Sequence, residues 1–196
     1  MPAKHEITND DIMARDDYIA VRPAHKREIT AIKKNRRVSV GPDATFYFES
    51  YDTMLHQVQE MLYIEKGGDD QIEDELSAYN PLIPNGRELV ATLMFEIDEP
   101  VRREKFLAGL GGVEETVTLT LGDETIAALP EDDIDRTTAD GKASSIQFLH
   151  FPFTLDQVEK FRDPESTVTL GIGHKQYGHM ANLTDVVKDA LANDFD

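Results

Sequence analysis

The chain has 196 residues, of which 40% are hydrophobic and 30% are charged, so it fits one domain with one core and a well-solvated surface. It contains no cysteine, which excludes disulfides, thiolate nucleophiles, zinc ribbons and any iron–sulfur cluster held by this chain alone. The formal net charge of −18 disfavours nucleic acid as a partner, because the molecule as a whole repels phosphates.

The N-terminal part predicts a helical region over residues 9–36. Its first residues are polar and offer no apolar run that could serve as a signal peptide or a membrane span, so we expect a cytosolic protein. A first helix is predicted from Asn9 to about Ala20. Pro23 suits the first turn of a second helix, His25 to about Asn35, whose apolar stripe is thin.

A hairpin and a helix are predicted next. Val38–Val40 and Ala44–Phe48 flank a Gly-Pro-Asp turn, and Asp52 can cap a helix from Thr53 to about Ile64. The face of this helix opposite its apolar stripe carries four polar or aromatic side chains: His56, Gln59, Glu60 and Tyr63. That face is expected to contact solvent or a partner, with half a metal site as the alternative.

An acidic helix from about Asp70 to Ala78 precedes a loop, Tyr79 to Arg87, that contains two prolines and an Asn-Gly pair. Leu82 and Ile83 in this loop either pack down on the core or form a contact surface or pocket lip. The run from Glu88 to Ile97 is apolar on both faces, which predicts a central strand.

The middle of the chain predicts a helix, a hairpin and a polar loop. Residues 102–110 have a helical pattern that ends at two glycines, and residues 117–121 alternate with threonines before a Gly-Asp turn into 125–129. Residues 131–142 are polar and are expected to form a loop.

The last third predicts a strand, a helix and a strand. The strands are Ser145–Phe151 and Val168–His174, and Thr154 begins a capping box for the helix between them. If the two strands are neighbours, this helix permits a parallel, right-handed crossover. With a final helix at 184–193, we predict a single α+β domain spanning 1–196, built on a mostly antiparallel sheet of about six or seven strands with helices packed on it.

The strongest functional signal is a basic segment from Arg22 to Arg37, which carries seven Lys or Arg residues and one acid in an otherwise acidic chain. On a helix, Lys26, Lys33 and Arg37 would line up and could hold phosphates or carboxylates. The segment either pairs with the acidic stretch Asp69 to Glu75 of the same chain or faces solvent, or it binds an external anionic small molecule, acidic protein or nucleic acid. The predicted binding residues are Lys26, Lys33, Lys34, Arg36 and Arg37.

A second candidate is a metal site. In the parallel arrangement His150 and His174 would emerge at one end of the sheet, and His179 follows a glycine-rich loop that could fold over that end. With Glu60 they could bind Zn²⁺ or Fe²⁺ and leave a position open for water. The alternative is that these histidines have polar or packing roles. Motifs of phosphate loops, dinucleotide folds, serine hydrolases and zinc proteases are absent from the sequence.

Several blocks together resemble a bacterial family, the domain of unknown function DUF3501. These blocks are Ile32–Val38 with Gly41-Pro42, Gln57–Leu62 with Glu65, Ala78–Pro84, and a C-terminal Gly-x-x-His-x-x-Tyr-like ending. The resemblance implies no activity, although it implies a link to redox or peroxide defence. Against the family pattern, His56 stands where an aromatic is expected, and Asp185–Asp196 is expected to be an addition.

Two functional hypotheses follow. The first is a cytosolic accessory protein that binds an acidic partner or an anionic ligand through the basic segment, without a membrane partner. The second is a metal-dependent enzyme or metal sensor that uses the His/carboxylate site. Assembly into a homo-oligomer is compatible with both.

Overall fold

The structure is a computed structural model, and it describes residues 4–131 and 142–196. The helices are α1 Arg15–Lys34, α2 Tyr51–Glu65, α3 Asp69–Tyr79, α4 Pro100–Ala108, α5 Leu155–Arg162 and α6 Asp185–Ala192. The strands are β1 Arg37–Val40, β2 Ala44–Phe48, β3 Glu88–Phe95, β4 Val117–Leu121, β5 Glu124–Ala127, β6 Leu129–Pro130, β7 Ile146–Pro152, β8 Val168–His174 and β9 Tyr177–Asn182.

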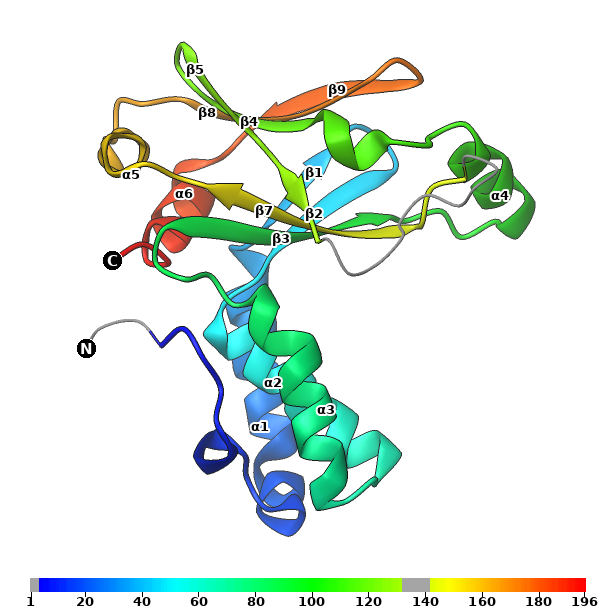
Figure 1. The fold of residues 1–196 in the computed structure, drawn as a ribbon, viewed down its shortest axis with the longest axis vertical. Helices are drawn as coiled ribbons and strands as arrows, with labels where there is room; N and C mark the ends of the chain where they lie inside the picture. The colour runs from blue at the N-terminus through cyan, green and yellow to red at the C-terminus, as the bar shows by residue number, and fades with distance from the viewer. Residues whose placement is uncertain (1–3, 132–141) are drawn as a thin grey trace.

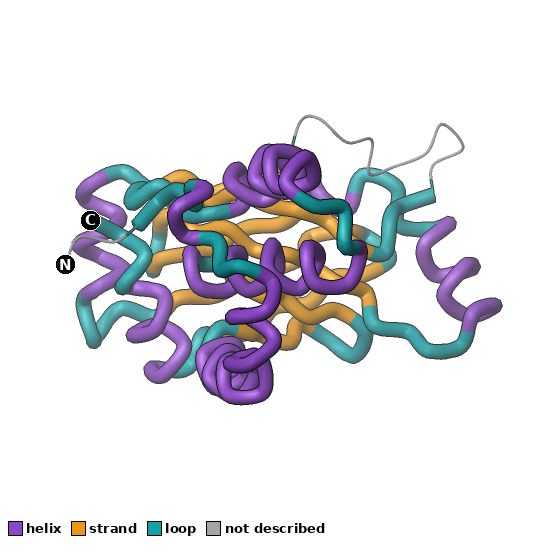
Figure 2. Tube along the Cα trace, turned by 90° about the horizontal axis from the view of Figure 1, so that it is seen from below, coloured by secondary structure: helices purple, strands orange, loops and turns teal. Residues whose placement is uncertain are grey.

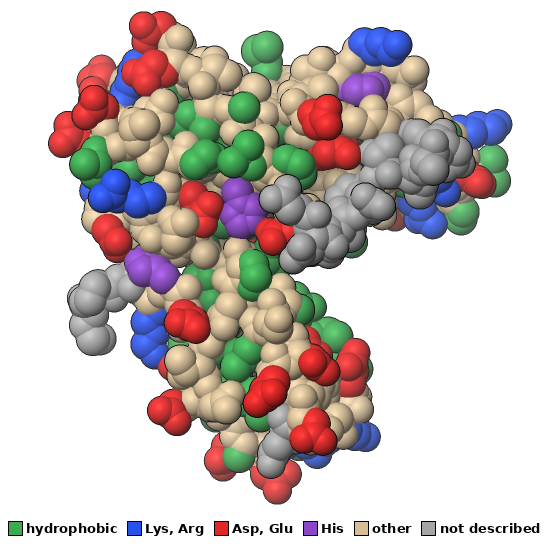
Figure 3. Space-filling view, in the orientation of Figure 1, with side chains coloured by type: hydrophobic (Ala, Val, Ile, Leu, Met, Phe, Trp, Pro, Cys, Tyr) green, Lys and Arg blue, Asp and Glu red, His purple; other side chains and the backbone are tan. Residues whose placement is uncertain are grey.

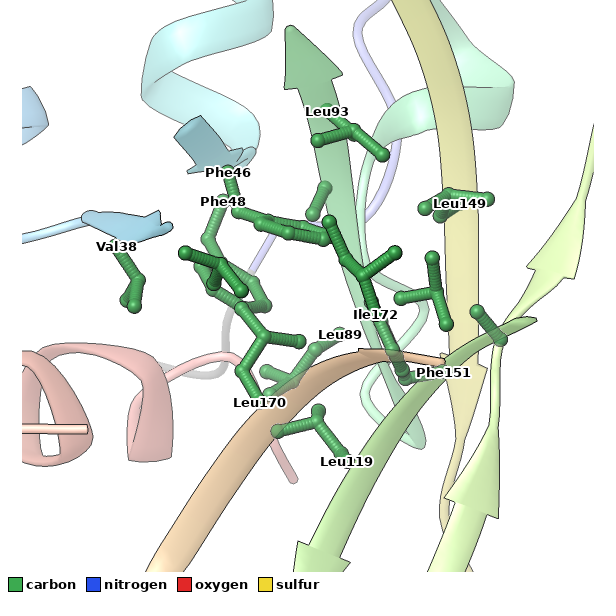
Figure 4. Packing of buried hydrophobic residues seen from close by; sticks show 14 of the residues in the cluster. Val38, Phe46, Phe48, Leu89, Leu93, Leu119, Leu149, Phe151, Leu170 and Ile172 are labelled. Carbon is green, nitrogen blue, oxygen red and sulfur yellow. The ribbon is translucent and has the colours of Figure 1, made fainter. Parts of the chain in front are cut away.

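The strands form two antiparallel sheets that pack face to face, and we call this pair the β body (Figure 1). One sheet has the order β1-β2-β3-β7-β6 and the other has the order β5-β4-β8-β9. Alternate residues of each strand point inward and meet in one core, in which Leu89 and Phe151 of the first sheet lie near Leu119 and Leu170 of the second (Figure 4). The predicted α+β class is therefore confirmed, although two sheets replace the single predicted sheet.

Helices α1, α2 and α3 project from the β body as a separate layer, which we call the arm (Figures 1 and 2). Met54 and Val58 of α2 pack with Val90 on the outer face of the first sheet. Leu82 and Ile83 are each 3% exposed and belong to this second cluster. Of the two interpretations of their loop, packing on the core is the one that the structure adopts.

The prediction of two helices in the N-terminal region is wrong. Asn9–Asp11 forms a short 3₁₀ turn, and α1 then runs without a break through Pro23. A proline inside a helix removes one backbone hydrogen bond, but it does not have to end the helix when tertiary contacts hold both halves. Buried Tyr18 and Ile29 anchor the halves before and after Pro23.

The parallel crossover predicted for the C-terminal third does not form. β7 and β8 belong to different sheets, so α5 connects the two layers instead of two neighbouring strands. The glycine-rich stretch after Gly171 is not a mobile loop, because β8 and β9 pair as a hairpin in which Gly173 lies opposite Gly178. The inward side chains of β8 cover the first sheet, which buries more apolar surface than an extra edge strand would.

The other local predictions agree with the structure. The hairpins β1–β2 and β4–β5 form, β3 lies between β2 and β7, and Thr154 caps α5 with a capping box. α2 is capped by Ser50, two residues before the predicted Asp52. Most of the polar loop predicted at 131–142 lies outside the described residues. In the described part of the chain, the helices are too short or too polar to cross a membrane.

Segments from both ends of the chain meet at the base of the arm. His5 donates from Nδ1 to the Pro84 carbonyl at 2.6 Å, and its Nε2 lies 3.1 Å from the Asp196 carboxylate. Phe195 bridges to Gly86, whose carbonyl accepts the Asp196 N–H at 3.1 Å. The arm is therefore joined to the β body through three segments that are distant in sequence.

Candidate functional site

A charged seam lies between α1 and α2, and Glu60 is at its centre. Arg22 donates to the two Glu60 carboxylate oxygens from Nε at 2.7 Å and from Nη2 at 2.8 Å, and the Tyr18 hydroxyl donates at 2.7 Å. The Arg22 guanidinium also lies 4.4 Å from the centre of the Tyr63 ring. Hydrogen bonding to Arg22 lowers the Glu60 pKa to about 2, so the Glu60 carboxylate is ionised at neutral pH. The face of α2 opposite its core stripe thus contacts α1.

Two imidazoles and a phenol occupy the same seam. The His25 and His56 rings lie 5.2 Å apart, and the Tyr18 hydroxyl lies 3.5 Å from His56 Nδ1. Burial lowers the His56 pKa to about 4, because desolvation penalises the imidazolium. Burial also raises the Tyr18 pKa, with the Glu60 hydrogen bond adding to the effect. At neutral pH His56 and Tyr18 are therefore neutral, and the charge of the seam comes from Arg22 and Glu60.

Some cations of the basic segment pair with carboxylates of the same chain, and others form no ion pair with the residues that the structure describes. Arg22 pairs with Glu60, and Lys26 lies 3.7 Å from the same carboxylate, so among the described side chains these two cations pair with Glu60 and not with the predicted acidic stretch. Among residues 4–131 and 142–196, no ion pair is formed by four of its cations: Arg27, Lys33, Lys34 and Arg37.

Arg36 does not belong to the exposed set, although it was predicted with it. Its side chain is 7% exposed and donates to the carbonyls of Phe48 and Glu49 and to the Asp194 carboxylate. Arg36 thereby joins α6 to the first sheet and cannot serve an external ligand. Since α1 ends at Lys34, Arg37 lies in β1 opposite Tyr47, and the predicted line of Lys26, Lys33 and Arg37 on one helix is not formed.

The unpaired cations stand out because acids dominate the surface. On the face shown in Figure 3, acidic side chains are spread over the arm and the β body, whereas Lys and Arg occur in a few separate groups. Arg27, Lys34 and Arg37 are exposed, and Ile19 and Val21 on the same helix expose 41% and 42% of their surface. By helical period, Arg27 and Lys34 lie on the side of α1 that does not contact α2, and Ile19 and Val21 flank that side.

The four residues of the predicted metal site are not brought together. His150 lies on the first sheet, whereas His174 and His179 lie on β8 and β9 of the second, and Glu60 is bound to Arg22 on the arm. The His179 ring packs on Tyr177, with ring centroids 4.5 Å apart. Within the described residues, no three His, Asp or Glu side chains are grouped so that they could hold a metal ion. The prediction depended on parallel pairing of β7 and β8, which the structure lacks.

His150 is instead held between two carboxylates. Its Nδ1 lies 3.0 Å from Glu88 and its Nε2 lies 2.7 Å from Glu131. The Glu88 hydrogen bond raises the His150 pKa above its usual value of 6.5, and the Glu131 bond acts in the same direction against the effect of burial. Glu131 follows β6 directly, so this contact fastens the short edge strand to β7.

A pH-dependent stability is expected from this contact. Because the folded pKa of His150 is raised, its stabilising contribution is fully present below the unfolded pKa of about 6.5 and is lost as pH rises through the folded pKa. Over that window the free energy of unfolding of the wild type should fall relative to that of His150→Gln, by at most about 1.4 kcal/mol per pH unit. Urea titrations between pH 6 and pH 9 would measure the difference. A constant difference across this range would contradict the assignment.

The residues of α1 that complete the seam were not singled out from the sequence. Tyr18, Arg22 and His25 are spaced by four and three residues, which places them on one helical face. This spacing indicates a shared helical face, but only if one helix runs through Pro23, where the sequence pattern predicts a break.

These features define a one-domain α+β protein in which a two-layer β body carries a helical arm with an internal charged seam and an exposed basic side. The chain belongs to the DUF3501 family, since a family model described as "Protein of unknown function (DUF3501)" matches residues 6–195. The match includes nearly all of the C-terminal stretch Asp185–Asp196, so the prediction that this stretch is an addition to the family pattern is wrong.

A crystal structure of a protein of unknown function from Burkholderia pseudomallei K96243 has the same fold. The two chains are 34% identical, the TM-score is 0.90, and the alignment covers 97% of this chain and 99% of the other. The comparison with curated proteins gives no match.

Proposed function

We propose that this chain is a cytosolic accessory protein that binds an acidic protein through the basic face of α1 and β1, defined as Lys26, Arg27, Lys33, Lys34 and Arg37. The observation that carries the proposal is that four of these five cations form no ion pair within the described part of the chain. Acidic residues outnumber Lys and Arg by 38 to 20, so internal partners are abundant. Cations that form no ion pair with the described residues, although acidic side chains are abundant, are suited to binding an external anion.

The spacing of the cations favours a protein over a small anion. Lys26 and Lys34 are eight residues apart, which corresponds to about 12 Å along a helix. A single phosphate or carboxylate cannot contact both ends of such a surface, whereas a partner that presents several carboxylates can. Nucleic acid also carries spaced anions, but the net charge of −18 opposes its approach.

Apolar contacts can add to the charge pairing. Ile19 lies two helical turns before Lys26, on the same side of α1; Ile19 is 41% exposed and the Lys26 side chain is 50% exposed. Protein interfaces combine an apolar centre with a charged rim, in which the rim sets association rate and selectivity. The expected partner therefore presents carboxylates around one or two apolar side chains.

Charge reversal on the basic face is expected to abolish partner binding. The variant Arg27→Glu, Lys34→Glu, Arg37→Glu alters three exposed side chains, and its matched control, Arg87→Glu, Lys105→Glu, Lys175→Glu, alters three exposed cations elsewhere with the same change in net charge. In a quantitative pull-down from the native host at low salt, the first variant should retain at least about tenfold less partner than the control, because like charges at the interface repel.

The outcome is decided by comparison of the two variants. Equal loss in both would mean that net charge alone matters, and full retention in the first would remove the basic face from the interface. Circular dichroism melts of each variant establish that the fold is retained, and raised salt should weaken the wild-type complex in the same assay.

A further inference from the structure

We infer that the tip of the arm holds a binding site for a small organic carboxylate with an apolar body. A cavity of about 390 Å³ lies there between the residues that lead into α1, the end of α2 and the start of α3. This volume is in the range of sites for small molecules. The cavity is separate from the basic face, and the inference does not depend on the proposed partner binding.

The walls of the cavity are apolar and aromatic. They are formed by Ile12, Met13, Leu62 and Ile72, with the rings of Tyr18 and Tyr63. A ligand body of alkyl or aryl carbon would lose its contact with water on these surfaces, which is the main source of affinity in such pockets.

One wall is held in place before any ligand arrives. The buried Gln59 side chain accepts from the Met13 N–H at 2.7 Å and donates to the Met13 carbonyl at 3.5 Å, so it fixes the segment before α1 on α2. The Tyr18 hydroxyl is already engaged by Glu60, whose charge Arg22 balances. The cavity therefore needs little rearrangement to bind, and Tyr18 presents mainly its ring.

The charge of the lining selects an anion. In a chain with 38 acidic residues, the side chains that the structure describes place no Asp or Glu in the lining, whereas Arg15 and Lys66 belong to it. In the described part of the chain neither cation forms an ion pair, and the Arg15 guanidinium lies 5.5 Å from the Tyr63 ring centre. Two cations that have no ion-pair partner among the described residues, set beside an apolar cavity, match a carboxylate attached to an apolar body.

The backbone at Lys66 supports the assignment. Lys66 has φ of 58° and is the sole non-glycine residue with positive φ among the described residues. This conformation is strained for a residue with a Cβ, and it commonly occurs at the end of a helix with glycine. Gly67 and Gly68 follow directly, so the chain places a lysine at the strained position although glycine is adjacent.

Isothermal titration calorimetry with four probes tests the site: octanoate, phenylacetate, octanol and octylamine. Octanoate and phenylacetate should bind, octanol should bind at least about tenfold more weakly than octanoate, and octylamine should not bind. The variant Arg15→Gln, Lys66→Gln should weaken octanoate binding at least about tenfold. Its matched control, Arg87→Gln, Lys105→Gln, removes two exposed charges far from the cavity and should bind as the wild type does.

A second variant keeps the test decisive. Met13→Trp fills the cavity from its rim, where Met13 is 44% exposed, and should remove binding of both carboxylates while the fold is retained. Equal affinity for octanol and octanoate, unchanged binding in the Arg15/Lys66 variant, or binding that survives Met13→Trp would each overturn the assignment. The Arg15/Lys66 variant should still retain the acidic partner in the pull-down, so failure of the carboxylate site is distinguishable from failure of the basic face.

Discussion

Replacement of Arg36 by alanine is expected to destabilise the protein by about 3–5 kcal/mol, which is the usual cost of breaking a buried ion pair from one side. The Arg36 and Asp194 side chains are 7% and 9% exposed and meet at 2.5 Å. Burial raises the Asp194 pKa, whereas the charge and hydrogen bond of Arg36 act in the opposite direction and favour the carboxylate. Arg36→Ala also leaves the carbonyls of Phe48 and Glu49 without their donor.

The measurement is urea-induced unfolding at pH 7, with Arg37→Ala as the matched control. Arg37 is the neighbouring arginine and is exposed, so its replacement should change the free energy of unfolding by no more than about 0.5 kcal/mol. The double variant Arg36→Ala, Asp194→Ala should be more stable than the sum of the single effects predicts, because it removes both members of the pair. Equal stability of the two single arginine variants would contradict this role of Arg36.

Replacement of Tyr177 by phenylalanine is expected to cost about 2–4 kcal/mol, although it removes a single oxygen atom. The Tyr177 hydroxyl accepts from the Asp43 and Ala44 N–H groups at 2.9 and 3.0 Å and donates to the Val40 carbonyl at 2.8 Å. Tyr177 is 3% exposed, so water cannot replace these bonds in the folded protein. The hydroxyl links β9 in the second sheet to the β1–β2 turn in the first.

Tyr47→Phe is the matched control for this change. The Tyr47 hydroxyl donates to Glu96 at an exposed position, where solvent can take over the bond, and its loss should cost less than about 1 kcal/mol. Thermal and urea unfolding of both variants would measure the difference. If the two variants were equally stable, the Tyr177 hydroxyl would not be a link between the sheets.

Local signals predicted most of the elements but not their assembly. Thr154 and Gln157 identify a helix start because a capping box is completed within four residues. The alternation in β8 identifies a buried face, but period two does not reveal which sheet the strand joins. The parallel crossover was inferred from the helix between β7 and β8, and a helix can equally connect two layers.

Of the charged seam between α1 and α2, the residues on α2 could be predicted from the sequence. The α2 face with His56 and Glu60 follows from helical period, whereas its partner, α1, is separated from it by a hairpin. Arg36 and Arg37 look alike in a count of charges. The inward alternation of Val38 and Val40 extends back to Arg36, so the strand phase distinguishes the buried arginine from the exposed one.

The meeting of distant segments at the base of the arm determines how the molecule can be divided. His5 contacts a residue 191 positions away and Arg36 contacts one 158 positions away, so the arm root is completed by residues that follow the whole β body in sequence. Closing such long loops lowers the chain entropy, and the contacts of the assembled protein offset that cost in free energy. The arm is therefore not a module, and a fragment ending after α3 would lack Pro84 and Asp196, which contact His5, and Asp194, which pairs with Arg36.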